Sequence, residues 1–325
     1  MKILITTKSR LPADKYGGTE RVIWSLGKEL HKLGHSVVFL AAPGSRCPFA
    51  KILNYYENSD LRNIIPNDID IVHFNSDIPS DCQFPYIVTQ HGNCQKGSTL
   101  DRQTVFVSSN HAARHGSKVY VHNGLDWSSV DLVNSPRTGF HFLGKAAWRR
   151  KNVKGAISST MQVKKVKLHI LGGHRLNLSM GFRFTANPRV RFHGMVDDVY
   201  KYSLMQKSKG LIFPVRWNEP FGLAIAESLY CGCPVFGTPY GSLSEIVSKE
   251  VGFLSNSSSD LASAMRDSDS WSKDYCHEYA SEKFNSLKMA LSYTKLYDQV
   301  LSGGVLNETN PTPSENPNTP LLWLD

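Results

Sequence analysis

The chain has 325 residues, of which 41% are hydrophobic and 20% are charged, and its formal net charge is +9. This length suffices for two ordinary domains, and the composition excludes a disordered or fibrous protein. No apolar run reaches the roughly 18–20 residues of a membrane span, and the first residues lack the pattern of a signal peptide. We therefore expect a soluble, cytoplasmic protein.

The positive charge leaves several partners open. The basic residues are scattered, and no helix-turn-helix, RNA-binding or zinc-finger signature accompanies them, so we expect no nucleic-acid partner. A pyrophosphate-bearing ligand, an anionic membrane surface at which the protein binds peripherally, or solubility alone would each explain the excess. The six cysteines contain no C-x-x-C pair, which indicates structural thiols rather than a metal or redox site.

The first forty residues set the fold class. Lys2–Thr6 is a short apolar strand, and the loop after it ends in Gly17-Gly18. A helix is expected from about Thr19 to Leu33, where apolar residues recur at helical spacing, and Gly34 ends it. Residues 36–42 are almost continuously apolar, as in a strand of a parallel sheet covered on both faces. This is one β-α-β unit.

Strands and helices go on alternating after this unit, which predicts an α/β protein with two doubly wound, Rossmann-like domains that face each other across a cleft. The composition loosens at residues 133–137, where we place the linker. The predicted domains are residues 1–132 and 133–274. Helices at 275–302 are expected to pack back on the N-terminal domain, and 303–325 to form a disordered tail. Further strands are expected at 69–74, 86–89, 104–108, 118–121, 141–144, 167–173, 190–194, 211–214 and 234–237.

One segment after a predicted strand carries the strongest chemical pattern. In open parallel sheets, ligands bind beyond the carboxyl ends of the strands, and Arg216–Glu227 follows the strand at 211–214. Gly222 lets the backbone approach a phosphate at the start of a helix, where N–H groups favour an anion. Glu219 and Glu227 each offer a carboxylate that accepts two hydrogen bonds from sugar hydroxyls. From spacing alone, helix-dipole complementation and a solvated helix face are the simpler interpretation of the two glutamates.

The segment E-P-F-G-L-A-I-A-E (219–227) resembles the E-x7-E motif of retaining glycosyltransferases with the GT-B fold, family 4 in particular. Gly17-Gly18, in Y-G-G-T-E-R-V, lies where that family has an N-terminal glycine loop. V-H-N-G-L-D (121–126) is similar to the family's N-G-I-D segment. The resemblance covers roughly residues 1–300. It implies transfer of a hexose from a nucleotide-diphosphate-sugar, by default a UDP-sugar, with no other cofactor and no metal.

The resemblance also assigns roles to residues of the donor site. Glu227 would bind the ribose hydroxyls and Glu219 the hydroxyls of the donor sugar. Backbone amides of Phe221, Gly222 and Leu223 would contact the sugar or the diphosphate. The backbone at Gly194 and Met195 would touch the base, and Gly17 and Gly18 would contribute to donor binding from the N-terminal domain.

Two lysines match the family's basic pair, which neutralises the leaving diphosphate by electrostatic stabilisation. Lys145 and Lys151 lie six residues apart in G-K-A-A-W-R-R-K. The family usually has arginine at the first position, and lysine supplies a point charge rather than a bidentate fork. Arg149 or Arg150 could share the role. Without the resemblance, exposed basic residues would be the simpler interpretation.

His91 follows a predicted strand in T-Q-H-G-N and resembles the family's active-site histidine, which contacts the donor sugar beside the reaction centre. We expect no metal site. Asp68-Ile69-Asp70 has the D-x-D pattern of metal-dependent glycosyltransferases, but it lies at the start of its strand, away from the expected cleft.

The acceptor is left open by the sequence: a saccharide, a lipid-linked acceptor and a small molecule all fit. The loops at residues 8–16 and 47–52 should shape its site. A non-catalytic nucleotide-sugar-binding protein and a nucleotide-sugar epimerase of the same fold are alternative functions. A dinucleotide oxidoreductase is disfavoured because no G-x-G-x-x-G follows the first strand of either domain.

Overall fold

The computed structural model describes the chain except for residues 14–16, 57–59, 80–81, 179 and 318. These residues form two compact units. Unit 1 comprises Met1–Trp127 and Phe284–Pro317, and unit 2 comprises Ser128–Lys283 and Asn318–Asp325. The α/β class with two doubly wound sheets is confirmed.

Unit 1 is built on a six-stranded parallel sheet with the order β3-β2-β1-β4-β5-β6. Its central strands are buried on both faces, which explains why their sequences are almost continuously apolar. The expected strand at 118–121 contributes only an isolated bridge between Tyr120 and Phe106, and a short edge strand, β3, was missed. The strands are β1 (Lys2–Thr6), β2 (Ser36–Ala41), β3 (Lys51–Asn54), β4 (Ile71–Phe74), β5 (Tyr86–Gln90) and β6 (Thr104–Phe106).

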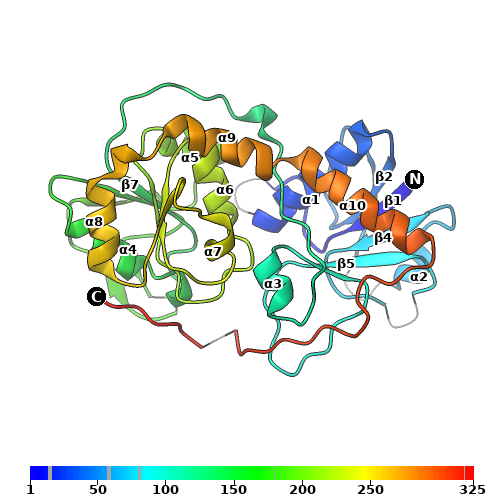
Figure 1. Ribbon diagram of the computed structural model, residues 1–325. Coiled ribbons are helices and arrows are strands. Elements are labelled where there is room, and N and C mark those ends of the chain that lie inside the picture. Colours follow the sequence, from blue (N-terminus) through cyan, green and yellow to red (C-terminus); the bar gives the residue numbers. More distant parts are fainter. Residues whose placement is uncertain (14–16, 57–59, 80–81, 179, 318) are drawn as a thin grey trace. The chain divides into compact units, whose positions relative to one another are not determined.

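The longest helices of unit 1 come from opposite ends of the chain. α1 (Gly18–Lys32) and α10 (Ser286–Leu301) contact each other, as the blue and orange ribbons show (Figure 1). α10 is held to the sheet by a buried polar network. His73 on β4 hydrogen-bonds Tyr297 and Thr89, each at 2.7 Å, and Thr89 hydrogen-bonds Tyr293 at 2.8 Å. The shorter helices are α2 (Leu61–Ile64) and α3 (Ser109–Ala113).

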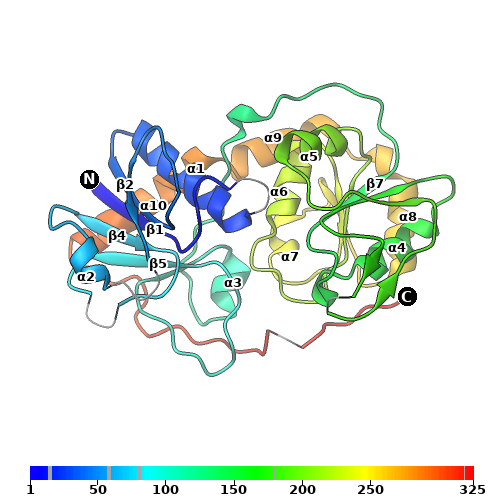
Figure 2. The same ribbon diagram turned by 180° about the vertical axis from the view of Figure 1, so that it is seen from behind.

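Unit 2 has a second six-stranded parallel sheet, with the order β11-β8-β7-β12-β13-β14. Figures 1 and 2 show helices on both faces of this sheet; α4 and α8 pack against each other over its main core, and α6 packs on α9. The strands are β7 (Phe140–Leu143), β8 (Leu168–Leu171), β11 (Val190–Phe192), β12 (Leu211–Phe213), β13 (Val235–Gly237) and β14 (Gly252–Leu254). The helices are α4 (Val153–Met161), α5 (Asp198–Met205), α6 (Leu223–Tyr230), α7 (Leu243–Ile246), α8 (Ser258–Arg266) and α9 (Lys273–Lys283).

The expected alternation of strand and helix fails once in unit 2. The crossover from β8 to the neighbouring parallel strand β11 carries an antiparallel hairpin, β9 (Leu176–Asn177) and β10 (Arg183–Phe184), where a helix would be usual. Short 3₁₀ turns lie at Trp127–Ser129, Arg149–Lys151 and Ser268–Ser270.

The unit boundaries differ from the predicted ones. The first falls at Trp127, ahead of the predicted linker, and the predicted helical segment 275–302 divides, since α9 belongs to unit 2 and α10 to unit 1. In the described parts of the chain, no helix is long and apolar enough to cross a bilayer.

The expectation of a disordered tail at 303–325 is wrong for its described residues. Asn307 is 7% exposed and hydrogen-bonds Arg102, Thr104 and Ser117. Further along, Trp323 packs against the core of unit 2. The tail is ordered because its backbone and amide groups pair with loops far away in the sequence, which its polar, proline-rich composition does not reveal.

Candidate functional site

The basic loop after β7 is fixed to the loop after β12. Asn152, in the left-handed conformation with φ 53°, caps α4 and donates from Nδ2 to the Pro214 carbonyl at 3.0 Å. The Arg216 amide donates to the Arg150 carbonyl at 2.7 Å. Both loops leave the carboxyl edge of neighbouring strands, where ligands bind in such sheets.

This fixation brings the predicted cation and the predicted sugar-binding carboxylate together. Lys151 Nζ lies 2.6 Å from Glu219 Oε2, and Trp217 Nε1 donates to the same oxygen at 2.9 Å. The side chains of Lys151 and Glu219 are only 13% and 9% exposed. The Ser242 amide donates to the Glu219 carbonyl at 2.9 Å, so the backbone is fixed as well. A largely buried charge pair of this kind needs both partners.

Aromatic rings hold the other cations of the loop. The Arg150 guanidinium lies between the rings of Trp148 and Trp217, at 4.8 and 4.7 Å. Lys145 is exposed, and its Nζ lies 5.5 Å from the Trp148 ring. Cation–π contacts orient these side chains without neutralising their charge. The loop therefore presents positive charge at the carboxyl edge of the sheet.

Glu227 lies on α6 and is 3% exposed. Its Oε1 accepts hydrogen bonds from Lys201 Nζ at 2.6 Å and from the Tyr202 hydroxyl at 2.9 Å, both on α5. Lys201 also pairs with Asp198 at 2.6 Å. Sequence reasoning missed Lys201 and Tyr202, since nothing in the local pattern links α5 with a residue about 25 positions later. They orient the carboxylate that the sequence assigns to the ribose.

Glycines keep the backbone accessible around these glutamates. Gly222, the N-cap of α6, has φ 87°, a conformation that favours glycine, and Phe221 before it is buried. Leu223 is the first residue of α6, so its amide belongs to the helix N-terminus, which favours an anion.

A second glycine group lies at the ends of three neighbouring strands, β7, β8 and β11. The Gly172 amide donates to the Gly194 carbonyl at 2.7 Å, and a Cβ at Gly172 would lie 2.4 Å from the Gly144 carbonyl oxygen. Gly194, assigned to the base, is therefore in a close-packed backbone layer, and the next side chain, Met195, is 46% exposed.

Of the predicted donor residues, Gly17, Gly18 and His91 belong to unit 1. Gly17 is the N-cap of α1 and its carbonyl accepts from the Arg21 amide at 3.1 Å, while Gly18 starts the helix. Residues 14–16 of the loop before them, which was also assigned to acceptor binding, lie outside the described residues. The glycine loop is thus described only at its helical end.

His91 follows β5 and belongs to a polar network across three strand ends. Asn75 Nδ2 donates to the Thr6 carbonyl at 3.1 Å, so its Oδ1 is free to accept from His91 Nε2, which lies 2.7 Å away. Burial lowers the pKa of His91 to about 4. The ring is therefore neutral near pH 7, with its proton on Nε2 and its lone pair on Nδ1.

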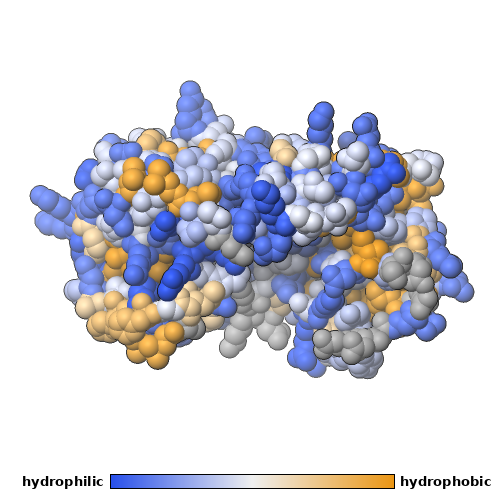
Figure 3. Space-filling view, turned by 90° about the horizontal axis from the view of Figure 1, so that it is seen from below, coloured by the Kyte–Doolittle hydropathy of each residue, from blue (hydrophilic) through white to orange (hydrophobic). Residues whose placement is uncertain are grey.

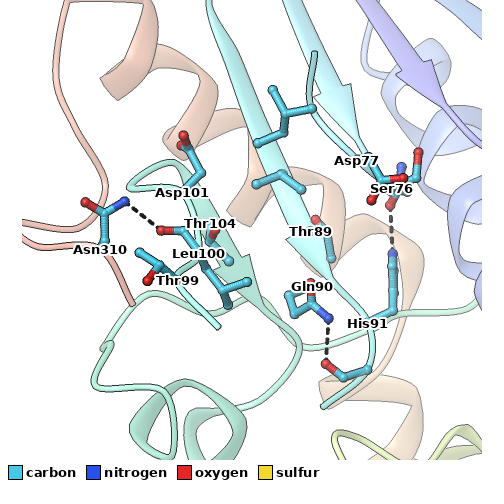
Figure 4. A pocket seen from close by; sticks show the side chains of 14 residues that line it. Ser76, Asp77, Thr89, Gln90, His91, Thr99, Leu100, Asp101, Thr104 and Asn310 are labelled. Carbon is cyan, nitrogen blue, oxygen red and sulfur yellow. Dashed lines mark hydrogen bonds between the residues drawn. The ribbon is translucent and has the colours of Figure 1, made fainter. Parts of the chain in front are cut away.

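A pocket of about 730 Å³ opens beside His91. Figure 4 shows His91 and Gln90 on one side and Thr99, Leu100 and Asp101 on the other, with Asn310 of the tail donating to the Leu100 carbonyl. Most of its lining side chains are polar, and its volume is in the range of sites for small molecules. Lys8, from the loop assigned to the acceptor, pairs with Asp77 in the pocket wall at 2.7 Å.

The acidic pair at Asp68 and Asp70 has a structural role at the opposite end of the sheet. Asp70 accepts from the Lys2 amide at 2.6 Å, and Asp68 pairs with Lys2 Nζ. Among the described residues, no group of three or more His, Cys, Asp or Glu side chains could hold a metal ion. All six cysteines are free thiols, and burial raises the pKa of Cys233 to about 11, so this thiol stays protonated.

Comparison of the sequence with known proteins gives a family match and one relative. Residues 137–268 match the family described as "Glycosyl transferases group 1". An "Uncharacterized 41.2 kDa protein in cps region" of Klebsiella pneumoniae is 30% identical over 115 residues, which are 33% of this chain. The match spans about a third (32%) of the length of that relative.

Solved structures match over almost the whole chain. AviGT4, a glycosyltransferase involved in avilamycin A biosynthesis, has a TM-score of 0.78 at 19% identity, covering 94% of this chain and 99% of its own. Sucrose-phosphate synthase of Thermosynechococcus elongatus has a TM-score of 0.72 at 18% identity, with 93% and 100% covered. HepE of Anabaena, solved with UDP-glucose, has a TM-score of 0.63 at 15% identity, with 93% and 100% covered. These similarities show the GT-B fold.

Proposed function

Because residues 137–268 match the family described as "Glycosyl transferases group 1", we propose that this protein transfers a hexose from a nucleotide-diphosphate-sugar, with a UDP-sugar as the default donor, to a hydroxyl of an acceptor. The transfer would retain the anomeric configuration and need neither a metal nor another cofactor. The observation that carries this proposal is the Lys151–Glu219 pair, fixed at the carboxyl edge of the sheet beside the N-terminus of α6.

The donor would be bound by groups of unit 2 with complementary chemistry. Lys145, Lys151 and the amides of residues 221–223 suit a diphosphate, because they supply positive charge and N–H donors where charge develops on the leaving group. Glu227, oriented by Lys201, suits the ribose diol, and Glu219 suits the hydroxyls of the hexose. The base would lie on the backbone at Gly194 and Met195. HepE, which shares the fold, was solved with UDP-glucose.

No protein nucleophile is needed in this proposal. The leaving diphosphate, stabilised by the two lysines, would accept the proton of the attacking hydroxyl on the same face of the sugar. By their resemblance to the family, His91 is assigned to the donor sugar and Gly17 and Gly18 to donor binding, and these assignments stay predictions. The neutral His91 offers an acceptor nitrogen rather than a positive charge.

The acceptor would bind in the pocket of unit 1. Its lining of amides, hydroxyls and carboxylates suits the hydroxyl groups of a saccharide, a lipid-linked saccharide or a polar small molecule. A lipid-linked acceptor would bring the protein to an anionic membrane surface, where it would bind peripherally.

The test is release of nucleotide diphosphate from a panel of UDP-, GDP-, ADP- and dTDP-sugars in the presence of candidate saccharides. We expect turnover with one donor and a loss of at least a hundredfold in Glu219→Gln and Lys151→Met. Lys164→Met, a change of an exposed lysine, is the matched control. Binding without release would favour a non-catalytic nucleotide-sugar-binding protein. Interconversion of the sugar without release would favour an epimerase.

A further inference from the structure

The hairpin in the β8–β11 crossover presents apolar side chains to solvent. In the register of β9 and β10, Leu176 pairs with Phe184 and Asn177 pairs with Arg183. Exposure alternates along both arms: Leu176, Leu178, Phe182 and Phe184 are exposed, whereas Arg183 is buried. Because side chains of a strand alternate between two faces, the apolar ones share the outer face.

We call the exposed apolar side chains of this hairpin the hairpin face: Leu176, Leu178, Met180, Phe182 and Phe184. They are between 50% and 72% exposed. Single exposed apolar residues are ordinary, but five on one hairpin are the pattern of an interaction site. The hydropathy-coloured surface in Figure 3 likewise shows apolar residues gathered in patches with hydrophilic borders.

The inner side of the hairpin is anchored to the body of unit 2, so the outward orientation is fixed. Arg183 donates to the His174 carbonyl at 2.9 Å and lies 4.9 Å from the ring of Phe192. Arg149 Nε donates to the Met180 carbonyl at 3.1 Å, at the turn of the hairpin. The hairpin cannot hide its apolar face by turning over without breaking these bonds.

Strong positive charge accompanies the hairpin face. Between Asp131 and Asp197 the chain has thirteen Lys and Arg residues and no Asp or Glu, which exceeds the net charge of +9 of the whole chain. The basic residues are thus concentrated in one stretch of the sequence, contrary to their interpretation as scattered, although Lys164, Lys165 and Lys167 precede β8 and lie away from the hairpin. A pocket of about 410 Å³ between the hairpin and the basic loop is lined by Arg149, Lys154 and Arg216 together with Met180 and Phe182.

We propose that the hairpin face and its basic surroundings dock unit 2 on an anionic lipid bilayer. Apolar side chains beside lysines and arginines match the boundary between acyl chains and anionic headgroups. A second copy of this chain is disfavoured because its own basic surface would meet this one. Nucleic acid would use the charge but leave five apolar side chains without a role. The proposal requires no step of the proposed transfer reaction.

The experiment is flotation of the full-length protein with vesicles of phosphatidylcholine alone or with about a third phosphatidylglycerol, at low and high salt. We expect binding to the anionic vesicles that weakens as salt screens the charges. Leu178→Ser/Phe182→Ser should lower the partition coefficient at least tenfold, since apolar burial is lost. Lys154→Ala should lower it about fivefold, the effect of one charge near the surface.

The matched control is Val199→Ser, which removes an 83% exposed apolar side chain on α5 and should leave binding unchanged. Unfolding temperatures should agree among all variants, because none of these side chains is buried. Equal binding to neutral vesicles, or equal binding by the double variant, would overturn the proposal. The proposal would also be overturned if the unaltered protein is a dimer and the double variant is a monomer. Binding of RNA in place of vesicles would overturn it too. Nucleotide release from a soluble donor is measured in the double variant as well. Release at the unaltered rate would show that the proposed function holds even where the docking proposal fails.

Discussion

Lys151 Nζ lies 2.6 Å from Glu219 Oε2, so the two residues assigned to opposite ends of the donor's hexosyl-diphosphate are ion-paired with each other. The pair keeps two charges tolerable in a largely buried position. A bound donor would compete for both groups, since its diphosphate attracts the lysine and its hydroxyls attract the carboxylate.

Removing only one partner of this pair should destabilise unit 2. Lys151→Met leaves the Glu219 carboxylate buried without its cation, at a cost of about 3–5 kcal/mol in the free energy of unfolding. The double variant Lys151→Met/Glu219→Gln should recover most of this stability, because Trp217 can still donate to the amide oxygen. Denaturant titration checks this. If the double variant is as unstable as the sum of the single variants, the two charges are not coupled.

The Lys201–Glu227 pair should determine nucleotide affinity. Lys201→Met removes the cation that pairs with Glu227 Oε1 and leaves only the Tyr202 hydroxyl on that oxygen, so we expect UDP affinity to fall at least tenfold in calorimetric titration. Lys209→Met is the control, because its partner Asp269 is 79% exposed and pairs with a solvated partner contribute about 0–1 kcal/mol. An unchanged UDP affinity in Lys201→Met would remove Glu227 from the ribose site.

The His73 network should make α10 important for the stability of unit 1. Tyr297→Phe leaves the buried His73 Nδ1 without its 2.7 Å partner, which should cost about 1–3 kcal/mol in thermal or denaturant unfolding. Tyr56→Phe, at a 57% exposed position, should cost nothing measurable. Equal stability of the two variants would show that water replaces the lost hydroxyl.

Mild acid should destabilise the protein. Burial lowers the pKa of His73 and of His141 to about 3, below the value of about 6.5 in an unfolded chain. Between these values the unfolded state binds more protons, so the free energy of unfolding falls as the pH falls. At pH 5.5 each histidine should cost about 1.4 kcal/mol relative to neutral pH. Scanning calorimetry from pH 7.5 to 5.5 tests this; a constant or rising unfolding temperature would contradict it.

The ordered tail should protect unit 1. Asn307→Ala removes three side-chain hydrogen bonds, to Arg102, Thr104 and Ser117, and should destabilise the unit by about 1–3 kcal/mol. Hydrogen exchange of the amides at 100–117 should accelerate in this variant. Glu308→Ala, next to it and exposed, is the control. Fast exchange of the same amides in the unaltered protein would contradict an ordered tail.

The strands with a continuous apolar sequence were predictable, because a strand that is buried on both faces has apolar side chains at almost every position. The edge strand β3 was not, since Lys51–Asn54 is half-exposed and its pairing with β2 depends on the rest of the sheet. The hairpin that replaces a crossover helix was not predictable either. Its apolar residues alternate as in a strand, but these five side chains are exposed, so the pattern does not mark a buried face. The ordered tail depends on partners about 200 residues away, such as Arg102.

Among the residues proposed for the donor, the sequence placed Lys151 and Glu219 after strands and Glu227 within the following helix, and the structure has them in these elements. It could not find Lys201, because the contact between α5 and α6 arises only when both helices pack on the sheet. The direct pairing of Lys151 with Glu219 was also missed, since similarity to a family assigns roles toward a ligand and is silent on contacts between protein side chains.

The division of the chain also bears on how the protein can be dissected. The backbone passes from one unit to the other after Trp127, Lys283 and Pro317. A proteolytic cut or stop codon after residue 127 would therefore release a fragment without α10, and with it the tyrosines that His73 needs. A fragment of residues 128–283 would lack Trp323, which packs against its core. Neither unit corresponds to an uninterrupted stretch of gene, so shuffling this protein with relatives at its midpoint would exchange incomplete cores.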